Sequence, residues 1–410
     1  MEKMEKLNNR ILTIVPYISA LALVVYIVCV FISPNGNALS LKYNIMFALP
    51  IAIVNFIIVK AYLNHNKNLQ KALLGFILSG LVMLSMHYTF SVKISTWYFI
   101  VLIAMFALIV IFTINQFLLS NDHYCRPGMV FVNQAIMNIL VITSLVSTVV
   151  DVVQFHDNPL IFISLLIFII ASMYLTLIIE MRVNDLKIAR EEKGYVFVKT
   201  ANNEEELTKE DMFISNKIFN TLPWIIVVSL ACSIIFNAIF DKAITRGYSL
   251  RYLFDVVEII CLFVAIMTYK HHNKDVMKNM NGFLLGLLLF EDIYEITFIS
   301  WDNITVKAIT VLVMIAFNAF FLITHLILTK THASNTKVVK LMKAMYIVYA
   351  IALIATAISW QVYYLMAKGT NYYFFLIKPF IWLLGTFPIT TAILTIDSRV
   401  NGFKVRREEK

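Results

Sequence analysis

Six ionisable residues stand within apolar stretches in the second half of this 410-residue chain. They are Asp255, Glu258, Glu291, Asp292, Glu295 and Lys378. Asp255 and Glu258 are three residues apart, and Glu291 and Glu295 are four apart, so each pair would share a face of an α-helix. An ionised side chain that faces lipid costs several kcal/mol, so acids inside a membrane normally line a bundle interior or a water-filled cavity. These residue types predict a substrate-binding site that holds a cation, exchanges protons or coordinates a divalent metal.

A structural role would explain the same residues differently. The acids could form ion pairs at the outer rim of the membrane and so hold helices together, with partners among Lys378, Arg246, Arg251 and Lys307. A rise of about 1.5 Å per residue places Asp255 and Glu295 about 7 Å from the outer end of their spans, and the other three acids at about 12–13 Å. Lys378 lies about five residues, or about 7 Å, from the outer end of its own span. Both interpretations are compatible with the sequence.

Composition identifies the medium around these residues. Hydrophobic residues make up 60% of the chain and charged residues only 14%, whereas soluble domains have about 25% charged residues. About 20 apolar residues cross the hydrocarbon core of a bilayer. Twelve stretches of the chain meet this requirement, at 11–33, 43–62, 72–91, 97–119, 129–150, 159–180, 220–241, 250–270, 281–300, 304–328, 341–366 and 373–396. We therefore expect an all-α polytopic membrane protein with about 12 transmembrane helices.

The two halves of the chain repeat each other. Residues 180–193 return as 397–410, with Arg182-Val183-Asn184 matched by Arg399-Val400-Asn401. His65-Asn66-Lys67 likewise returns as His272-Asn273-Lys274. The early offset is 207 (272 − 65) and the late offset is 217 (399 − 182), which places about ten extra residues after the ninth span.

A period of about 200 residues is far longer than a solenoid unit, so we predict a tandem duplication. Its parts are a first six-helix repeat at 1–193, a cytoplasmic linker at 194–219 and a second six-helix repeat at 220–410. An even number of spans in each half makes the two repeats parallel, related by an axis along the membrane normal.

The acids distinguish the two repeats. At the offset of 207 they correspond to Ala48, Ile51, Leu84, Ser85 and Tyr88 in the first half, none of which is charged. The acids are therefore not required by the fold. Weaker polar candidates, Gln134 with Asn138 and Asn318 with His325, are expected to make hydrogen bonds between helices.

Lysine and arginine cluster in the segments that one orientation places inside the cell. They are Lys3, Lys6, Arg10, Lys60, Lys67, Lys71, Lys270, Lys274, Lys278, Lys330, Lys337, Lys340 and Lys343. One loop departs from this pattern, because Lys242, Arg246 and Arg251 lie outside in the same scheme. We predict a multi-pass protein of the cytoplasmic (plasma) membrane with both termini cytoplasmic. The net charge of +9 then follows from topology and not from binding to nucleic acid.

The predicted arrangement resembles that of the major facilitator superfamily, with twelve spans in two parallel halves and a cytoplasmic middle segment. The loop between spans 2 and 3 in that family typically contains Gly, Asp and an Arg pair. Here the loop is Asn64-His65-Asn66-Lys67-Asn68. The resemblance is one of architecture, which implies transport only by analogy, and we do not assign the chain to the family.

Three classes of function fit the pattern. A secondary transporter of a small solute, with a cation favoured by the acids, explains the repeat, the sparse soluble mass and the buried charges, and it is the function we expect. A metal-dependent membrane enzyme with a carboxylate site in the outer leaflet explains the acids but not the duplication. A membrane-embedded sensor or scaffold protein explains the low count of 11 glycines and the paired tails.

The sequence contains no P-loop, nucleophile elbow, zincin helix or Rossmann motif, so an enzyme is less favoured. No cofactor or metal is assigned. The expected partners are the lipid bilayer and a small solute or cation.

The predicted topology is tested by thiol labelling in intact cells, on a background in which the four native cysteines are replaced. The Asn203→Cys variant should resist an impermeant thiol reagent, because residue 203 is expected inside the cell. The Asp157→Cys variant should react with it, because the loop that contains residue 157 is expected outside. The opposite pattern of labelling would overturn the orientation.

Overall fold

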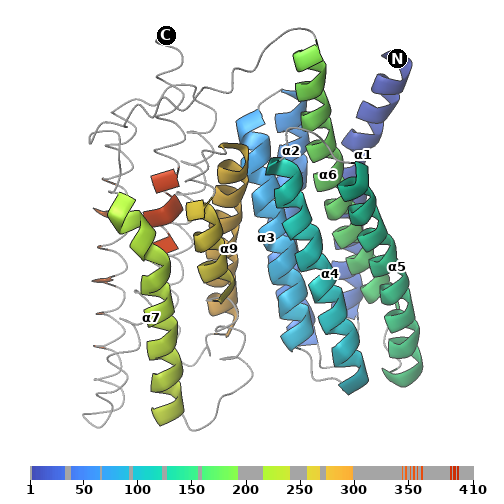
Figure 1. Ribbon diagram of the computed structural model, residues 1–410. Helices are drawn as coiled ribbons and strands as arrows, with labels where there is room; N and C mark the ends of the chain where they lie inside the picture. The colour runs from blue at the N-terminus through green and yellow to red at the C-terminus, as the bar shows by residue number, and fades with distance from the viewer. Residues whose placement is uncertain are drawn as a thin grey trace. The chain divides into compact units, whose positions relative to one another are not determined.

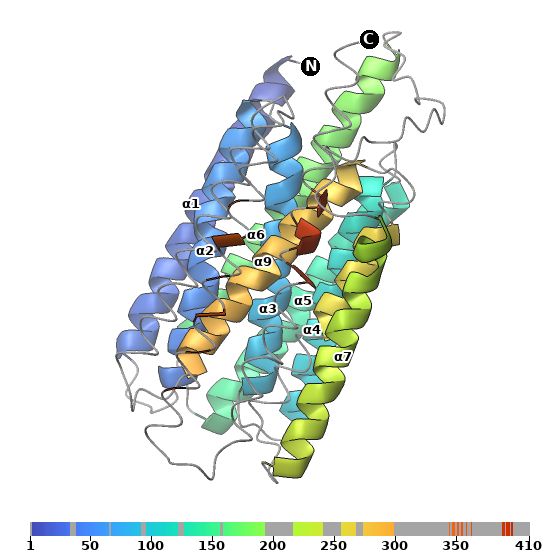
Figure 2. The ribbon, with the colours of Figure 1, turned by 90° about the vertical axis from the view of Figure 1, so that its left-hand side faces the viewer.

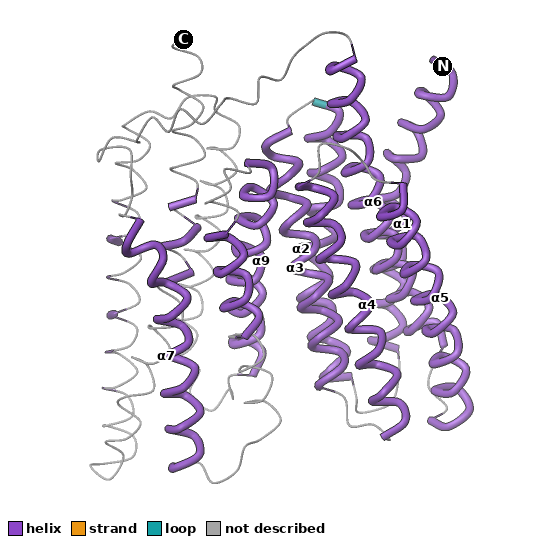
Figure 3. The backbone as a smooth tube through the Cα atoms, viewed as in Figure 1, coloured by secondary structure: helices purple, strands orange, loops and turns teal. Residues whose placement is uncertain are grey.

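The computed structural model describes the chain at residues 2–32, 38–64, 67–91, 96–121, 127–155, 159–192, 216–240, 256–267 and 274–298, with isolated positions between 344 and 396. Over this part of the chain every element is an α-helix (Figures 1 and 3). The labelled helices are α1 (Glu2–Ile32), α2 (Ala38–Leu63), α3 (Lys67–Ser91), α4 (Thr96–Asn121), α5 (Pro127–Phe155), α6 (Pro159–Glu192), α7 (Asn216–Phe240) and α9 (Lys274–Phe298). A further helical segment is Val256–Met267.

Seven of these helices, α1 to α7, are long and apolar enough to cross a membrane. The chain is therefore a multi-pass helical membrane protein, as its composition predicts. The shorter apolar stretch Val256–Met267 falls within the expected eighth span, and Val276–Phe290 begins before the expected ninth span and overlaps its first half. The tenth expected span, 304–328, lies outside the described residues, and the last two are described only at isolated positions. The count of twelve helices and the tandem repeat stay predictions.

The chain divides into two compact units, Met1–Asn203 and Glu204–Lys410. In the first unit, consecutive helices from α1 to α6 pack against one another, and α6 closes the bundle through its extensive contact with α1. Helices α1, α2 and α6 lie side by side in both views (Figures 1 and 2). Helix α6 also contacts α2, α3 and α4, so it touches every other helix of this unit.

Apolar side chains cover most of the surfaces of these helices, because the surrounding medium is lipid. Leu21 and Phe31 on α1 and Ile142 on α5 are exposed. Such residues would be placed badly on a soluble protein, but they match hydrocarbon. Proline begins both α5 and α6, at Pro127 and Pro159, where the missing N–H costs no intrahelical hydrogen bond.

A hydrogen-bonded contact among three helices lies inside the first unit. The Asn55 side chain on α2 is fully buried. Its Nδ2 atom donates to Ser19 Oγ on α1 at 3.2 Å and to Ser172 Oγ on α6 at 2.9 Å. Buried polar groups need such partners, so this asparagine fixes how α1, α2 and α6 meet.

The polar face of α5 differs from the sequence expectation. Gln134 and Asn138, expected in contacts between helices, both have exposed side chains. Their neighbour Asn133 is buried instead, and its Oδ1 accepts a hydrogen bond of 2.7 Å from Asn115 on α4. Adjacent residues point about 100° apart around a helix, so a one-residue difference decides which amide enters the bundle.

The Asn55 contact is tested by Asn55→Ala. Hydrogen bonds between transmembrane helices contribute about 0.6 kcal/mol on average and at most about 1.7 kcal/mol, and Asn55 makes two. We expect this variant to lose about 1–2 kcal/mol of stability, measured by unfolding of the full chain in detergent. The matched change Asn138→Ala, at an exposed amide, should have little effect. Equal losses in the two variants would contradict the assigned role of Asn55.

Candidate functional site

A buried ion pair joins α3 and α6 of the first unit. Lys71 lies on the first turns of α3, and its Nζ forms a salt bridge with Oε1 of Glu180 on α6. Both side chains are only 1% exposed. The same Nζ donates a hydrogen bond of 2.9 Å to Ser120 Oγ near the end of α4. Three helices thus meet at one lysine.

The energetics of this pair depend on both members being present. Removing a charge from water costs several kcal/mol, and only a well-placed opposite charge offsets that cost. An ammonium group has three N–H donors, and two of those of Lys71 are directed at Glu180 and Ser120. Oε2 of Glu180 is buried and has no hydrogen-bond partner among the described residues. The pair is neutral as a whole, so it offers no net charge to a cation or an anion.

The ion pair lies near one end of the bundle. The apolar window of α3 is Leu69–Thr89 and that of α6 is Pro159–Met181, so Lys71 is just inside the first window and Glu180 is at the end of the second. This is the end that the bias of basic residues predicts to be cytoplasmic. Sequence reasoning used Lys71 only as a flanking charge and missed its partner. Two clues were available: Lys71 recurs as Lys278, and Glu180 begins the repeated tail.

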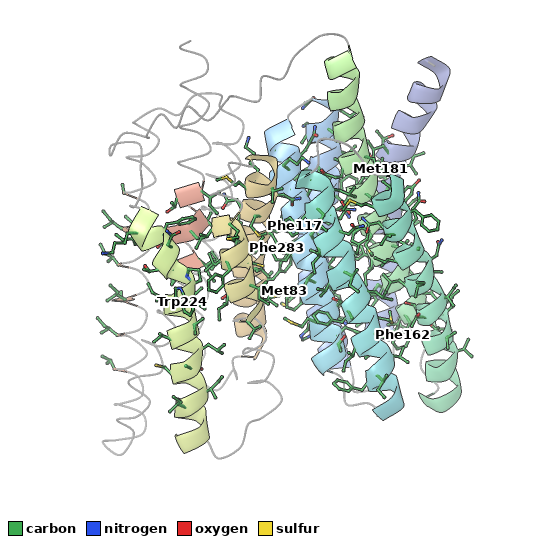
Figure 4. All side chains as sticks on the ribbon, viewed as in Figure 1. Met83, Phe117, Phe162, Met181, Trp224 and Phe283 are labelled. Atoms are coloured by element: carbon green, nitrogen blue, oxygen red, sulfur yellow. The ribbon has the colours of Figure 1, made fainter. Side chains whose placement is uncertain are left out.

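A small cavity lies toward the other end of the same unit. It has a volume of about 60 Å³ and is lined by residues of α3, α4, α5 and α6. This is room for a few water molecules, since one water needs at least about 10–15 Å³. Figure 4 shows Phe162, which lines the cavity, and Met181, which follows Glu180, toward opposite ends of α6.

The cavity is mostly apolar, with a few hydroxyl groups. Thr89 Oγ1 donates to the Ser85 carbonyl at 2.8 Å, and Thr148 Oγ1 donates to the Ser144 carbonyl at 2.8 Å. The Ser85 hydroxyl donates to the Val82 carbonyl at 2.9 Å. Each proton is donated to a carbonyl of its own helix, and Thr89 Oγ1 also donates to the Leu102 carbonyl on α4 at 3.3 Å. The hydroxyl oxygens keep lone pairs that can accept hydrogen bonds. Such a hollow suits water or a small, weakly polar group and offers no charge to a cation.

Four of the predicted acids lie on two helical segments of the second unit. Glu258 is on Val256–Met267, where it is 2% exposed and within electrostatic range of Cys261. Glu291, Asp292 and Glu295 are on the last turns of α9. Asp255 and Lys378 lie outside the described residues. The convergence of all six on one cavity therefore stays a prediction.

Helices α3 and α9 have the same length and coincide in their bounds at the offset of 207. Both have 25 residues. They begin at Lys67 and Lys274 and end at Ser91 and Phe298, and both pairs are separated by the repeat offset (274 − 67 = 207 and 298 − 91 = 207). At this offset the α9 acids correspond to three residues of α3 that all line the cavity, namely Leu84, Ser85 and Tyr88.

In comparisons with models of protein families, with curated proteins and with solved structures, nothing matches this chain. The function is therefore argued from the residues and their positions.

The ion pair is tested by Glu180→Ala. Removing one partner of a buried pair leaves an uncompensated charge and typically costs about 3–5 kcal/mol, so we expect a loss of this size in the unfolding free energy of the full chain. Replacing both charges, as Lys71→Met with Glu180→Leu, should restore most of the stability. Lys60→Met removes an exposed lysine on α2 and should be nearly silent. A double variant as unstable as Glu180→Ala would contradict the pairing.

Proposed function

We propose that this protein is a secondary transporter of the cytoplasmic membrane, and that it moves a small cationic solute through an acidic, outward-facing site in its second half. The site consists of Asp255, Glu258, Glu291, Asp292 and Glu295, with Lys378 as internal counter-ion. The proposal includes the duplicated twelve-helix architecture with both termini in the cytoplasm.

The observation on which the proposal rests is the position of the acids within the repeat. In the first unit, the residues that correspond to Glu291, Asp292 and Glu295 line a cavity. Ile51, which corresponds to Glu258, is fully buried, and Glu258 itself is 2% exposed. If the second half repeats the first, its acids occupy cavity-lining and buried positions. They would then face a shared interior volume, where a membrane protein can keep charged groups.

The chemistry of such a cluster suits coupled transport. Carboxylates that share a small volume repel one another, so they cannot all remain ionised unless cations or protons join them. One lysine among five acids leaves the site with an excess of negative charge. A cationic solute and protons would therefore compete for it, and this competition couples the movement of one to the movement of the other.

The two-unit division of the chain also supports the proposal. The boundary between the compact units, Asn203 to Glu204, falls within the linker expected at 194–219. Transporters built from two repeats work largely by motion of one bundle against the other. A boundary between two six-helix bundles would allow this motion.

Glu291→Gln is the decisive variant, because glutamine keeps the shape and hydrogen-bonding capacity of the side chain but removes its charge. The purified full chain is reconstituted in vesicles that contain a pH-sensitive dye, and Na⁺, K⁺, Ca²⁺ or tetramethylammonium is added outside. We expect at least one of these cations to evoke a pH change inside wild-type vesicles. Glu291→Gln should reduce its rate at least about tenfold, the loss that corresponds to about 1.4 kcal/mol.

The control is Glu205→Gln, which removes a carboxylate from the linker segment and should transport at the wild-type rate. Thermal unfolding of Glu291→Gln should remain close to wild type. The transporter proposal fails if no cation evokes a pH change in wild-type vesicles, or if Glu291→Gln transports normally. A variant that unfolds at much lower temperature would instead assign the acids a structural role.

A further inference from the structure

We propose that Lys278 and Asp397 form a second buried ion pair, which joins α9 to the last apolar segment of the second half. It would be the counterpart of the Lys71–Glu180 pair in the first half. Each half would then have one buried ion pair between two of its own helices, at the same end of its bundle. The inference does not rest on transport, because it concerns how each half is held together.

The lysine is placed by helix register. Lys71 is the fifth residue of α3, and Lys278 is the fifth residue of α9. Lys71 is completely buried, and Lys278 is 8% exposed. Lysine is almost never buried to this extent unless it is paired. The same residue type at the same turn of the corresponding helix therefore calls for the same kind of partner.

The late offset of 217 between the two similar tails identifies the candidate carboxylate. Glu180 stands two residues before Arg182-Val183-Asn184, and Asp397 stands two residues before Arg399-Val400-Asn401. Both residues are acids at the offset of 217 (397 − 180). If the tail was retained after a duplication, each copy of it begins with an acid. A carboxylate is the partner that a buried lysine needs.

The residues that precede Asp397 in the sequence are buried, and this supports the placement. On α6, Ser172, Leu175, Thr176 and Ile179 form a buried stripe that leads to Glu180. Their counterparts at the offset of 217 are Ile389, Ala392, Ile393 and Ile396, which are helical and at most 1% exposed.

Thr391 and Thr395 are buried as well, so burial in this segment is not confined to these four positions. The spacing i, i+3, i+4, i+7 is that of one helix face, and the next position on the face is i+8. For the second half that position is residue 397. Asp397 itself lies outside the described residues, so the inference depends on this register.

The consequence concerns rigidity. The observed pair ties α3 to α6, the helix that contacts every other helix of the first unit. A matching pair would tie α9 to the corresponding helix of the second half. Because both partners of each pair belong to one half, neither pair would join the two halves. Each pair would stiffen its own bundle while leaving the bundles separate.

Charge-reversal variants test this inference, and the measurement is the thermal unfolding temperature, Tm, of the full chain in detergent. Asp397→Ala should lower Tm by the same several degrees as Glu180→Ala. Lys278→Asp should also lower Tm, and adding Asp397→Lys should restore most of the loss, because the pair is re-formed with reversed charges. The matched control adds Glu205→Lys to Lys278→Asp, which places the new lysine in the linker segment, leaves the Lys71–Glu180 pair intact and should not restore Tm.

A second measurement does not depend on stability. On the cysteine-free background, Lys278→Cys with Asp397→Cys should be joined by a short bifunctional thiol reagent in membranes. Lys278→Cys with Glu180→Cys should not be joined. The inference is overturned if Asp397→Ala leaves Tm unchanged, if Glu205→Lys restores the Tm of Lys278→Asp as well as Asp397→Lys does, or if the 278–397 pair does not cross-link. None of these outcomes depends on transport, so they are distinguishable from failure of the proposed function.

Discussion

Hydrocarbon offers no hydrogen-bonding partner, so a polar group within a membrane span is favoured when it finds one inside the protein or near the ends of the span. The backbone meets this requirement by forming helices over the whole described chain. Side chains meet it by grouping: Asn55 reaches serines on two other helices, and Lys71 reaches a glutamate and a serine on two others. Polar contacts therefore specify which helices of the first unit are neighbours, while apolar surface fills the space between them.

Charged residues stand within apolar segments in both halves of this chain, and we infer that they serve different purposes in each. Lys71 and Glu180 cancel each other, and their value is positional, since a buried pair adds little net stability but fixes one arrangement against others. The five acids proposed for the second-half site outnumber Lys378, the one counter-ion proposed with them. Such an excess is costly unless a cation or a proton joins it. A neutral pair such as Lys71–Glu180 suits a structural role, whereas a group of acids with excess negative charge suits the binding of a cation.

The repeat separates what a six-helix bundle needs from what one copy acquired. Buried lysines stand at the fifth positions of α3 and α9, and an acid begins each of the two similar tails of the sequence. At the other end of α3, Leu84, Ser85 and Tyr88 line a small cavity, and the positions at the offset of 207 on α9 are three acids. If the halves arose by duplication, as we predict, these acids are a difference that only one copy acquired.

The sequence by itself determined the medium, the helical class and the places of the first seven spans, because these depend only on the length and composition of apolar runs. It also identified the acids, because charge inside such a run is conspicuous. Only the tertiary structure decided which faces look inward. Helices that are apolar all round have no amphipathic stripe to show the buried side, so Asn133 could not be preferred over Gln134 or Asn138. The same reason hid the Lys71–Glu180 pair, since its members are 109 residues apart and meet only when α3 packs on α6.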